Sequence, residues 1–149
     1  MILPANLLTV LLVEDDPADV ELTRMSLEQG KVKLRLDVVE DGVKAMDYLN
    51  QRGVYADTPL PDLVLLDLNL PRKDGRQVIE EIRASARLRC LPIVVLTTSS
   101  ADADILRSYS LGANCYITKP AGFEDLVKIV RQIEDFWFTI VRLPTKARG

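Results

Sequence analysis

Short, unbroken runs of aliphatic residues, separated by longer segments of helical period, constrain the fold of this sequence most. Leucine, valine and isoleucine dominate residues 7–13, 63–66 and 93–96. Such continuous runs are typical of strands that are buried on both faces, as in a parallel sheet covered by helices. We therefore predict that these runs form the centre of a parallel sheet.

Two weaker segments complete the predicted sheet. Residues 33–39 alternate charged and aliphatic side chains, which indicates a strand with one polar face at a sheet edge. Residues 114–118 form a short fifth strand, in which Tyr116 and Ile117 are the residues with strong β propensity.

Five segments with a helical period lie between and after these strands. Asp16 is a good N-cap for the first helix, Pro17 suits its first turn, and Gly30 ends it. Pro144 stops the last helix. The predicted helices are residues 17–29, 41–51, 75–86, 101–111 and 124–141.

Strand and helix alternate along the chain, which predicts one α/β domain over residues 1–149. The expected fold is a flavodoxin-like, doubly wound sheet of five parallel strands with five helices and right-handed crossovers. The end of the last helix, about residues 134–143, is predicted to be a C-terminal helical extension. In such open sheets the chemistry lies at the carboxyl ends of the strands.

The composition excludes several classes of function. The chain contains no histidine, which removes imidazole as a base, a metal ligand or a phosphate carrier. A net charge of −3 and a pI near 5.0 argue against a nucleic-acid partner. Cys90 and Cys115 lack a metal-ligand spacing and are predicted to be free thiols.

The longest uncharged run gives no sign of a membrane or an export route. Residues 1–13 are too few for a membrane span and lack the basic start of a signal peptide. We therefore expect a cytoplasmic protein with no membrane partner.

Charged or reactive residues stand at the ends of four of the five predicted strands. They are Glu14, Asp15, Asp67, Thr97 and Lys119. Carboxylates that gather at one rim repel each other unless a cation lies between them. Oxygen ligands without histidine or thiolate favour a hard cation, and a few carboxylates suit Mg²⁺ better than a Ca²⁺ cage. We therefore predict a Mg²⁺ site at this rim.

The same residues suit phosphoryl transfer. A carboxylate such as Asp67 can accept a phosphoryl group and form an acyl phosphate. Lys119 supplies a compact positive charge, and Thr97 supplies a hydroxyl for a phosphoryl oxygen. The sequence has no glycine-rich nucleotide-binding motif. We therefore expect the donor to be another protein or a small phosphoramidate rather than ATP.

Four motifs resemble the receiver domains of bacterial two-component response regulators. They are LLVEDDP at 11–17, LVLLDLNLPRKDG at 63–75, PIVVLTTSS at 92–100 and GANCYITKP at 112–120. The resemblance covers nearly the whole chain and implies the strand order 2-1-3-4-5. It also implies a phosphoacceptor of a phosphorelay, which receives its phosphoryl group from a sensor histidine kinase and then changes its contacts with an unknown downstream protein.

The resemblance implies roles for the acidic residues. Asp67 would accept phosphate from the phosphohistidine of the kinase. Glu14 and Asp15 would form the acidic pair that holds Mg²⁺ together with Asp67. Asn69 would lend its backbone carbonyl to the metal.

The resemblance also implies the switching residues. Thr97 would be the switch hydroxyl, and Tyr116 would be its aromatic partner, which changes rotamer. Lys119 would contact the phosphoryl group and precede a cis bond to Pro120. Ala121 departs from the phenylalanine that many receivers carry there.

Three segments are similar to the small stand-alone regulators that partner cyanobacterial phytochromes, which are red-light-sensing histidine kinases. They read LDLNLPRKDGR, SYSLGANCYITKP and IEDFWFTIVRLP. The resemblance therefore implies a phytochrome kinase as the partner and no attached output module.

The last predicted helix has more apolar surface than one buried stripe requires. Its stripe is Leu126, Ile129, Val130, Ile133, Trp137 and Ile140. Because exposed apolar surface marks protein contacts, we predict an interface at Phe136, Trp137 and Phe138, with the tail through Leu143. This interface would serve a homodimer or kinase docking. In the alternative, the tail folds back over its own domain.

Two other functions remain open from the residues alone. A Mg²⁺ phosphatase of the haloacid-dehalogenase kind also uses an aspartyl phosphate, but it needs a second acid where this chain has Asn69. A binding scaffold that works without phosphate would leave the clustered carboxylates unsupported. We expect no enzyme activity beyond the domain's own phosphotransfer and autodephosphorylation. Asp19 and Glu21 are predicted to be a solvated helix start without a role.

Overall fold

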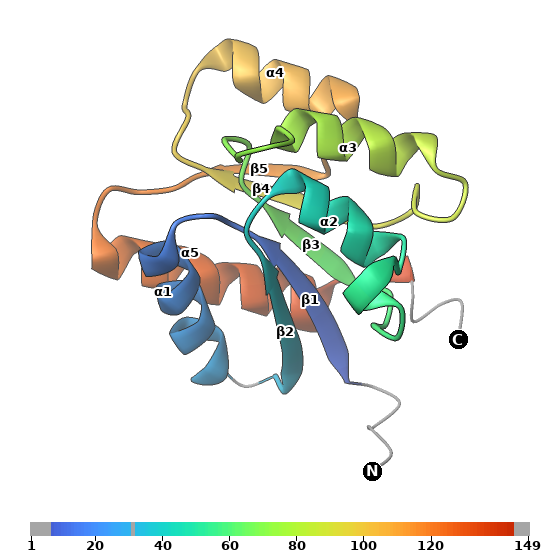
Figure 1. The fold of residues 1–149 in the computed structure, drawn as a ribbon. Helices are drawn as coiled ribbons and strands as arrows, with labels where there is room; N and C mark the ends of the chain where they lie inside the picture. The colour runs from blue at the N-terminus through green and yellow to red at the C-terminus, as the bar shows by residue number, and fades with distance from the viewer. Residues whose placement is uncertain (1–6, 31, 145–149) are drawn as a thin grey trace.

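The computed structural model describes residues 7–30 and 32–144 and has a parallel sheet at its centre (Figure 1). The strand order is β2-β1-β3-β4-β5, and each neighbouring pair is parallel, which confirms the predicted topology. The strands are β1 (Leu8–Val13), β2 (Leu34–Val39), β3 (Leu63–Leu66), β4 (Ile93–Thr97) and β5 (Cys115–Thr118).

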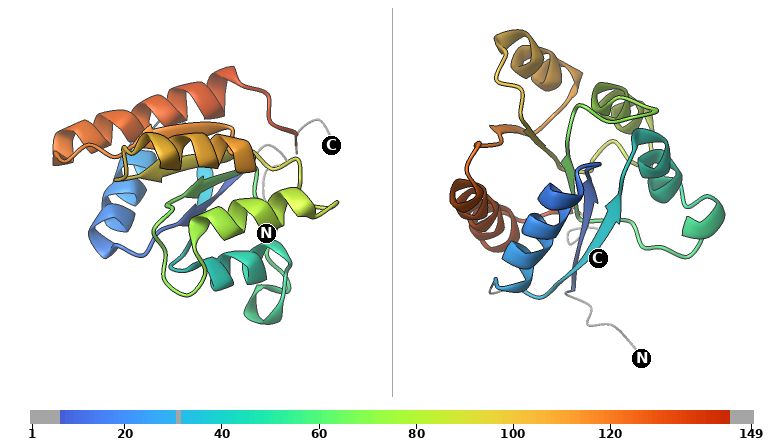
Figure 2. Two further views of the ribbon diagram at one scale, coloured as in Figure 1. Left: turned by 90° about the horizontal axis from the view of Figure 1, so that it is seen from above. Right: turned by 60° about the vertical axis from the view of Figure 1, so that its left-hand side comes forward.

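Within residues 7–30 and 32–144, five α-helices alternate with the strands. They are α1 (Pro17–Glu28), α2 (Gly42–Leu49), α3 (Gly75–Ala84), α4 (Asp102–Leu111) and α5 (Phe123–Ile133). A short 3₁₀ helix, η1 (Gly53–Tyr55), follows α2. Figures 1 and 2 show α1 and α5 on one face of the sheet and α2, α3 and α4 on the other. Among the described residues, no helix has both the length and the apolar character that crossing a membrane requires.

The central strands are buried on both faces, because their side chains alternate between two apolar layers. Leu11 of β1 lies in a buried cluster with Met46 of α2 and Ile79 of α3. The next residue, Leu12, lies in a second cluster with Ile133 of α5. Since successive strand residues point to opposite faces, an unbroken aliphatic run fills both layers.

Local sequence signals set the ends of several elements as predicted. The Asp16 side chain caps α1 by accepting a hydrogen bond from the Ala18 amide at 2.9 Å. α4 is followed by Gly112, whose φ of 119° is accessible to glycine without strain. β2 is the edge strand beside β1, and most of its residues are only partly buried.

The C-terminal helix differs from the single α-helix predicted for residues 124–141. α5 ends at Ile133 and continues as a π-helix, η2 (Glu134–Ile140). The i→i+5 turns of a π-helix are wider, so they rotate side chains off the α-helical stripe. As a result, Ile140 is 70% exposed, whereas Phe138 packs against the apolar clusters. The predicted stripe is wrong at Ile140. Phe138 is only partly buried, as Trp137 is, so its place in the predicted interface stays a prediction.

The tail after η2 folds back over its own domain. Leu143 is only 4% exposed and belongs to the same cluster as Val10 and Leu12 of β1. Val141 packs against that cluster from the outside. The alternative prediction, that the tail folds back over its own domain, is therefore confirmed as far as Leu143.

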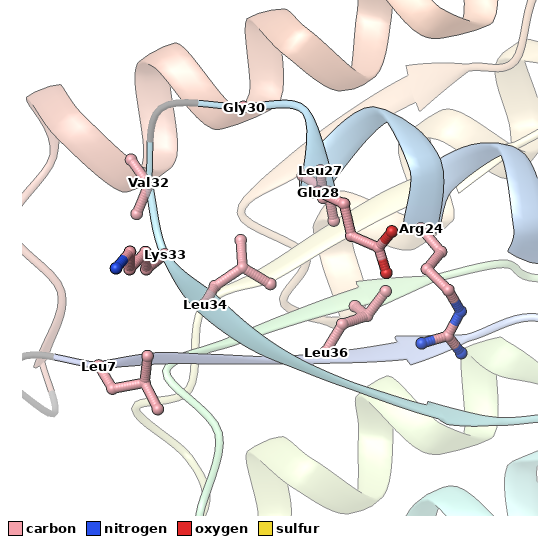
Figure 3. Close-up of a pocket in the computed structure, with 9 residues that line it drawn as sticks. All are labelled: Leu7, Arg24, Leu27, Glu28, Gly30, Val32, Lys33, Leu34 and Leu36. Carbon is pink, nitrogen blue, oxygen red and sulfur yellow. The ribbon is translucent and has the colours of Figure 1, made fainter. Parts of the chain in front are cut away.

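A hollow of about 600 Å³ lies between the end of α1 and the first half of β2. Figure 3 shows Leu27, Leu34 and Leu36 there, beside the charged side chains of Arg24 and Glu28. None of its lining residues is among those predicted for the functional site.

Replacing Leu143 with alanine tests how much the tail stabilises the domain. The change leaves a gap in a packed cluster, so we expect a loss of about 2–4 kcal/mol in the free energy of unfolding. Ile140→Ala is the matched control, because an exposed side chain should change stability by less than about 0.5 kcal/mol. Urea unfolding followed by circular dichroism measures both variants. Equal unfolding midpoints for the two would contradict the packing of the tail.

Candidate functional site

The carboxyl ends of four strands bring the predicted residues to one rim of the sheet. Glu14 follows β1, Asp67 follows β3, Thr97 ends β4 and Lys119 follows β5. The Asp67 amide donates to the Val13 carbonyl at 3.0 Å, and the Lys119 amide donates to the Thr97 carbonyl at 2.6 Å. These bonds continue the sheet beyond the strands, so the backbone holds the side chains in place.

Glu14, Asp15 and Asp67 form an acidic cluster. Each offers one carboxylate oxygen, and the three oxygens lie within 4.8 Å of one another. Glu14 and Asp67 are buried, while Asp15 is exposed and leaves room for water on one side. Three carboxylate oxygens at this spacing fit a hard divalent cation such as Mg²⁺ or Mn²⁺. The fold thus brings together the three acids that the sequence singled out.

The Lys119 ammonium lies among three carboxylates. Its Nζ contacts Glu14 Oε1 and lies 2.9 Å from Asp19 Oδ2 and 3.2 Å from Asp67 Oδ2. The prediction that Asp19 is solvated and has no role is therefore wrong. Asp19 is on the first turn of α1, and α1 begins immediately after the acidic pair. The short distance along the sequence between Asp15 and Asp19 was the signal that could have placed Asp19 in the site. Only the fold shows that α1 is turned so that the Asp19 side chain reaches Lys119.

Burial and the neighbouring charges shift the pKa values of two groups in this site. Burial raises the pKa of Glu14 from 4.5 to about 7. The hydrogen bond from Lys119 opposes this rise, and the negative charge of Asp67 adds to it. Burial lowers the pKa of Lys119, but its contacts with Glu14 and Asp19 outweigh burial, so that pKa is raised. Burial dominates the shift at Glu14, whereas the surrounding carboxylates cause the shift at Lys119. A divalent cation would offset the crowding of carboxylates at this site.

Asp67 has a defined set of hydrogen-bond partners. The hydroxyl of Thr97 donates to Asp67 Oδ1 at 2.7 Å, and the Asn69 amide donates to the same oxygen at 3.2 Å. Lys119 lies beside the other oxygen, Oδ2. Thr97 is fully buried, so the bond from its hydroxyl is shielded from water. The Asn69 carbonyl as a metal ligand stays a prediction.

Gly75 allows the start of α3 to approach Asp67 closely. A Cβ at residue 75 would lie 2.4 Å from the Asp67 carbonyl oxygen, which no side chain tolerates. The Gly75 amide also donates to the Leu68 carbonyl at 2.9 Å. This close approach was not predicted from the sequence, although Asp74 before the glycine is a good helix cap. The loop after Asp67 is therefore held against α3.

Tyr116 connects β5 to the loop between β4 and α4. Its hydroxyl donates to the Ser99 carbonyl at 2.8 Å, and its side chain is partly buried. Its backbone amide donates to the hydroxyl of Tyr109 on α4 at 3.1 Å. These contacts place Tyr116 beside the loop that begins at Thr97, while its change of rotamer stays a prediction.

The peptide bond before Pro120 differs from the expectation. The resemblance implied a cis bond between Lys119 and Pro120, but no peptide bond among the described residues is cis. The expectation is therefore wrong for this structure, and the bond has the trans form that most X–Pro bonds adopt.

Comparison with known proteins identifies the family. The model of the response regulator receiver domain matches residues 10–131 of the chain. The chain therefore belongs to the response regulator receiver family and has a phosphoacceptor role in two-component signalling.

Individual relatives cover almost the whole chain. Response regulator Rcp1 of Synechocystis sp. is 47% identical over 135 residues, which are 91% of this chain and 92% of Rcp1. The phosphorylated cyanobacterial phytochrome response regulator RcpA has a TM-score of 0.90 at 47% identity, over 93% of this chain and 99% of RcpA. The Mn²⁺-bound form of Rcp1 has a TM-score of 0.88 at 46% identity, over 91% of this chain and 98% of that one. The predicted resemblance to phytochrome response regulators is confirmed.

Replacing Thr97 with valine tests the hydrogen bond to Asp67. Valine keeps the shape but leaves a buried carboxylate without one donor, so we expect a loss of about 1–3 kcal/mol in the free energy of unfolding. Thr118→Val is the control, because in the part of the chain that the structure describes this exposed hydroxyl reaches only the Ser99 carbonyl, at 3.4 Å. Denaturant unfolding compares the two variants. If both are equally stable, the bond to Asp67 does not stabilise the site.

Proposed function

We propose that Asp67 receives a phosphoryl group from the phosphohistidine of a sensor histidine kinase and thereby switches the protein's contacts. The observation that carries this proposal is the convergence of the acidic cluster, Thr97 and Lys119 on the Asp67 carboxylate. Residues 1–149 would form a single receiver domain with a helical extension over about 134–143. Membership of the receiver family supports this assignment.

The surroundings of Asp67 suit nucleophilic attack on phosphorus. An Asp67 carboxylate oxygen forms the new P–O bond while the P–N bond to the donor imidazole breaks. The imidazole leaves with the bonding electron pair and takes up a proton, and Asp67 becomes an acyl phosphate. Lys119, 3.2 Å from Asp67 Oδ2, places positive charge beside the phosphoryl oxygens. Water later hydrolyses the acyl phosphate at the same site, and we expect no activity on other substrates.

The acidic cluster suits Mg²⁺ as the cofactor. Glu14, Asp15 and Asp67 would supply carboxylate oxygens, and Asn69 would supply its backbone carbonyl. When bound, the cation supplies positive charge that neutralises the crowded carboxylates and the phosphoryl oxygens. The similar protein Rcp1 has a Mn²⁺-bound form, which supports the binding of a divalent cation.

Thr97 and Tyr116 would carry the change to the surface. The Thr97 hydroxyl, which donates to Asp67 Oδ1 at 2.7 Å, would turn to a phosphoryl oxygen. Tyr116 would respond because its hydroxyl donates to the carbonyl of Ser99, two residues after Thr97. A new rotamer of Tyr116 would alter the surface formed by α4, β5 and α5.

The kinase that fits best is a phytochrome. The similarity to the phytochrome response regulator RcpA, at 47% identity, supports this partner. Since histidine kinases use ATP, we place the protein in the cytoplasm. A further protein would act downstream, and the net charge of −3 argues against nucleic acid as that partner. We propose no membrane partner.

The helical extension would support a homodimer. Phe136 is 50% exposed, and its ring meets that of Trp137 edge to face, with centroids 5.5 Å apart. Both rings line a cavity of about 240 Å³ together with Cys115 and Ile117 of β5. Exposed aromatic surface beside an apolar cavity is typical of a protein contact. Phe138 is partly buried against the apolar clusters and would contribute the part of its surface that stays exposed.

Labelling with a phosphoryl donor tests the role of Asp67. Asp67→Asn keeps the shape of the side chain but removes the nucleophilic carboxylate, so we expect Mg²⁺-dependent labelling to be abolished. Asp57→Asn, an exposed acid outside the cluster, should be labelled like the unmodified protein. The donors are phosphoramidate, which needs no kinase, and a purified red-light-sensing histidine kinase.

The two donors separate the acceptor from the partner. Persistent aspartyl labelling of the Asp67→Asn variant would contradict the acceptor assignment. Labelling by phosphoramidate, but not by the phytochrome kinase in either red or far-red light, would keep the acceptor and reject the phytochrome.

Placing a charge at Phe136 tests the homodimer. Phe136→Asp should convert the protein to a monomer, because the interface would have to bury an unpaired carboxylate. Val54→Asp is the control, since this side chain is 90% exposed on the remote element η1. Sedimentation equilibrium, with and without phosphoramidate, measures the association state. An unchanged dimer in the Phe136→Asp variant, or a protein that is monomeric throughout, would rule out this interface.

A further inference from the structure

Three side chains from separate elements form a polar clasp next to the phosphoacceptor rim: Arg76 of α3, Asp104 of α4 and Ser99 of the loop between β4 and α4. Arg76 Nη2 donates to Asp104 Oδ1 at 2.7 Å. The Ser99 hydroxyl donates to the other oxygen, Asp104 Oδ2, at 2.6 Å. Arg76 Nη1 also donates to both carboxylate oxygens of Asp74, the N-cap of α3, at 3.0 Å. Asp104 therefore joins the loop and α4 to the start of α3.

The loop that the clasp holds is the one that leaves the phosphoacceptor site. Thr97, bonded to Asp67, is the last residue of β4 and lies two residues before Ser99. The Ser99 carbonyl accepts the hydroxyl of Tyr116 at 2.8 Å. Ser99 is thus held on two sides, through its side chain by Asp104 and through its carbonyl by Tyr116.

An ordinary surface ion pair would not produce this arrangement. Exposed ion pairs contribute little to stability. An acid at the start of α4 can also be explained by its favourable interaction with the helix dipole alone. Asp102 stands in the same turn and is exposed, and its side chain makes no hydrogen bond or ion pair to other described residues. The Asp104 side chain, by contrast, is 29% exposed and uses both oxygens on two different elements. The hydrogen bond from Ser99, followed by that from Arg76, lowers the pKa of Asp104.

We propose that Arg76 and Asp104 are positioning residues that couple the phosphoacceptor end of β4 to helices α3 and α4. The clasp makes residues 98–101, the first turn of α4 and Tyr116 respond together when Thr97 moves. Without it, Asp67 still binds its ligand, but the loop moves independently of the helices. The coupling role rests on the proposed function of Asp67. The hydrogen bonds of the clasp are present whatever the function of Asp67 is.

Hydrogen exchange of the full chain, with no ligand present, tests whether the clasp holds the loop. Asp104→Ala removes both contacts of the carboxylate, so we expect roughly tenfold faster amide exchange across residues 98–105, consistent with loss of charge-assisted bonds. Asp102→Ala is the matched control, with the same change of charge in the same helical turn. Ser99→Ala keeps the carbonyl that Tyr116 contacts and tests the hydroxyl alone. If both Asp104→Ala and Ser99→Ala exchange like the control, the clasp does not hold the loop.

Beryllofluoride with Mg²⁺, a mimic of the phosphoryl group, tests the coupling. Fluorine-19 NMR reports binding at Asp67, and hydrogen exchange reports the response of α4 and Tyr116. We expect Asp104→Ala to bind the mimic while losing most of the response that the unmodified protein and Asp102→Ala show in α4. A full response in both Asp104→Ala and Ser99→Ala would overturn the coupling role. If the unmodified protein fails to bind the mimic, the proposed function and the coupling fall together, but the ligand-free comparison still decides whether the clasp holds the loop.

Discussion

The crowding of carboxylates around Lys119 is the interaction on which the rest of the site depends. Glu14, Asp19 and Asp67 all contact its ammonium group, and Asp15 adds a further acid to the cluster. Like charges at such distances repel each other, so free side chains would move apart. They stay together because the acids follow paired strands or lie on the first turn of α1. Because the backbone holds the carboxylates together against their repulsion, the rim favours the binding of a cation. The positive charge of that cation would in turn favour a phosphoryl group.

The sheet can resist this repulsion because it is packed on both faces. Aliphatic side chains fill two layers, one against α2 and α3 and the other against α5. The tail contributes to the second layer, since Leu143 lies in that cluster and Phe138 packs against it. The π-helical winding of η2 therefore has a structural effect, because it turns Phe138 inward and leaves Phe136 outside. One local change of helix type thus packs Phe138 against the apolar layers and leaves Phe136 half exposed.

The rim differs from the sheet, because polar contacts between loops and helices hold it. From Asp67 a chain of bonds leads through Thr97 to the loop at Ser99, where it divides toward Tyr116 and toward Asp104. Such bonds can exchange partners at little cost where water or another acceptor is available, whereas the apolar layers cannot rearrange without losing their packing. A rigid sheet below a rim of exchangeable hydrogen bonds allows one local chemical event to alter a surface some distance away.

The sequence by itself determined the elements and the residues at the rim. Unbroken aliphatic runs predicted the buried strands, and the residues that follow them, such as Asp67 and Lys119, were expected at one edge because parallel strands end together. Asp19 and Asp104 resemble ordinary acids at helix starts, and nothing local distinguishes Asp104 from Asp102. Only the tertiary structure decided their contacts, because these depend on how α1 and α4 are turned against distant segments. Local propensity and periodicity are properties of neighbouring residues, whereas a hydrogen bond between distant residues is set by the packing of the whole domain.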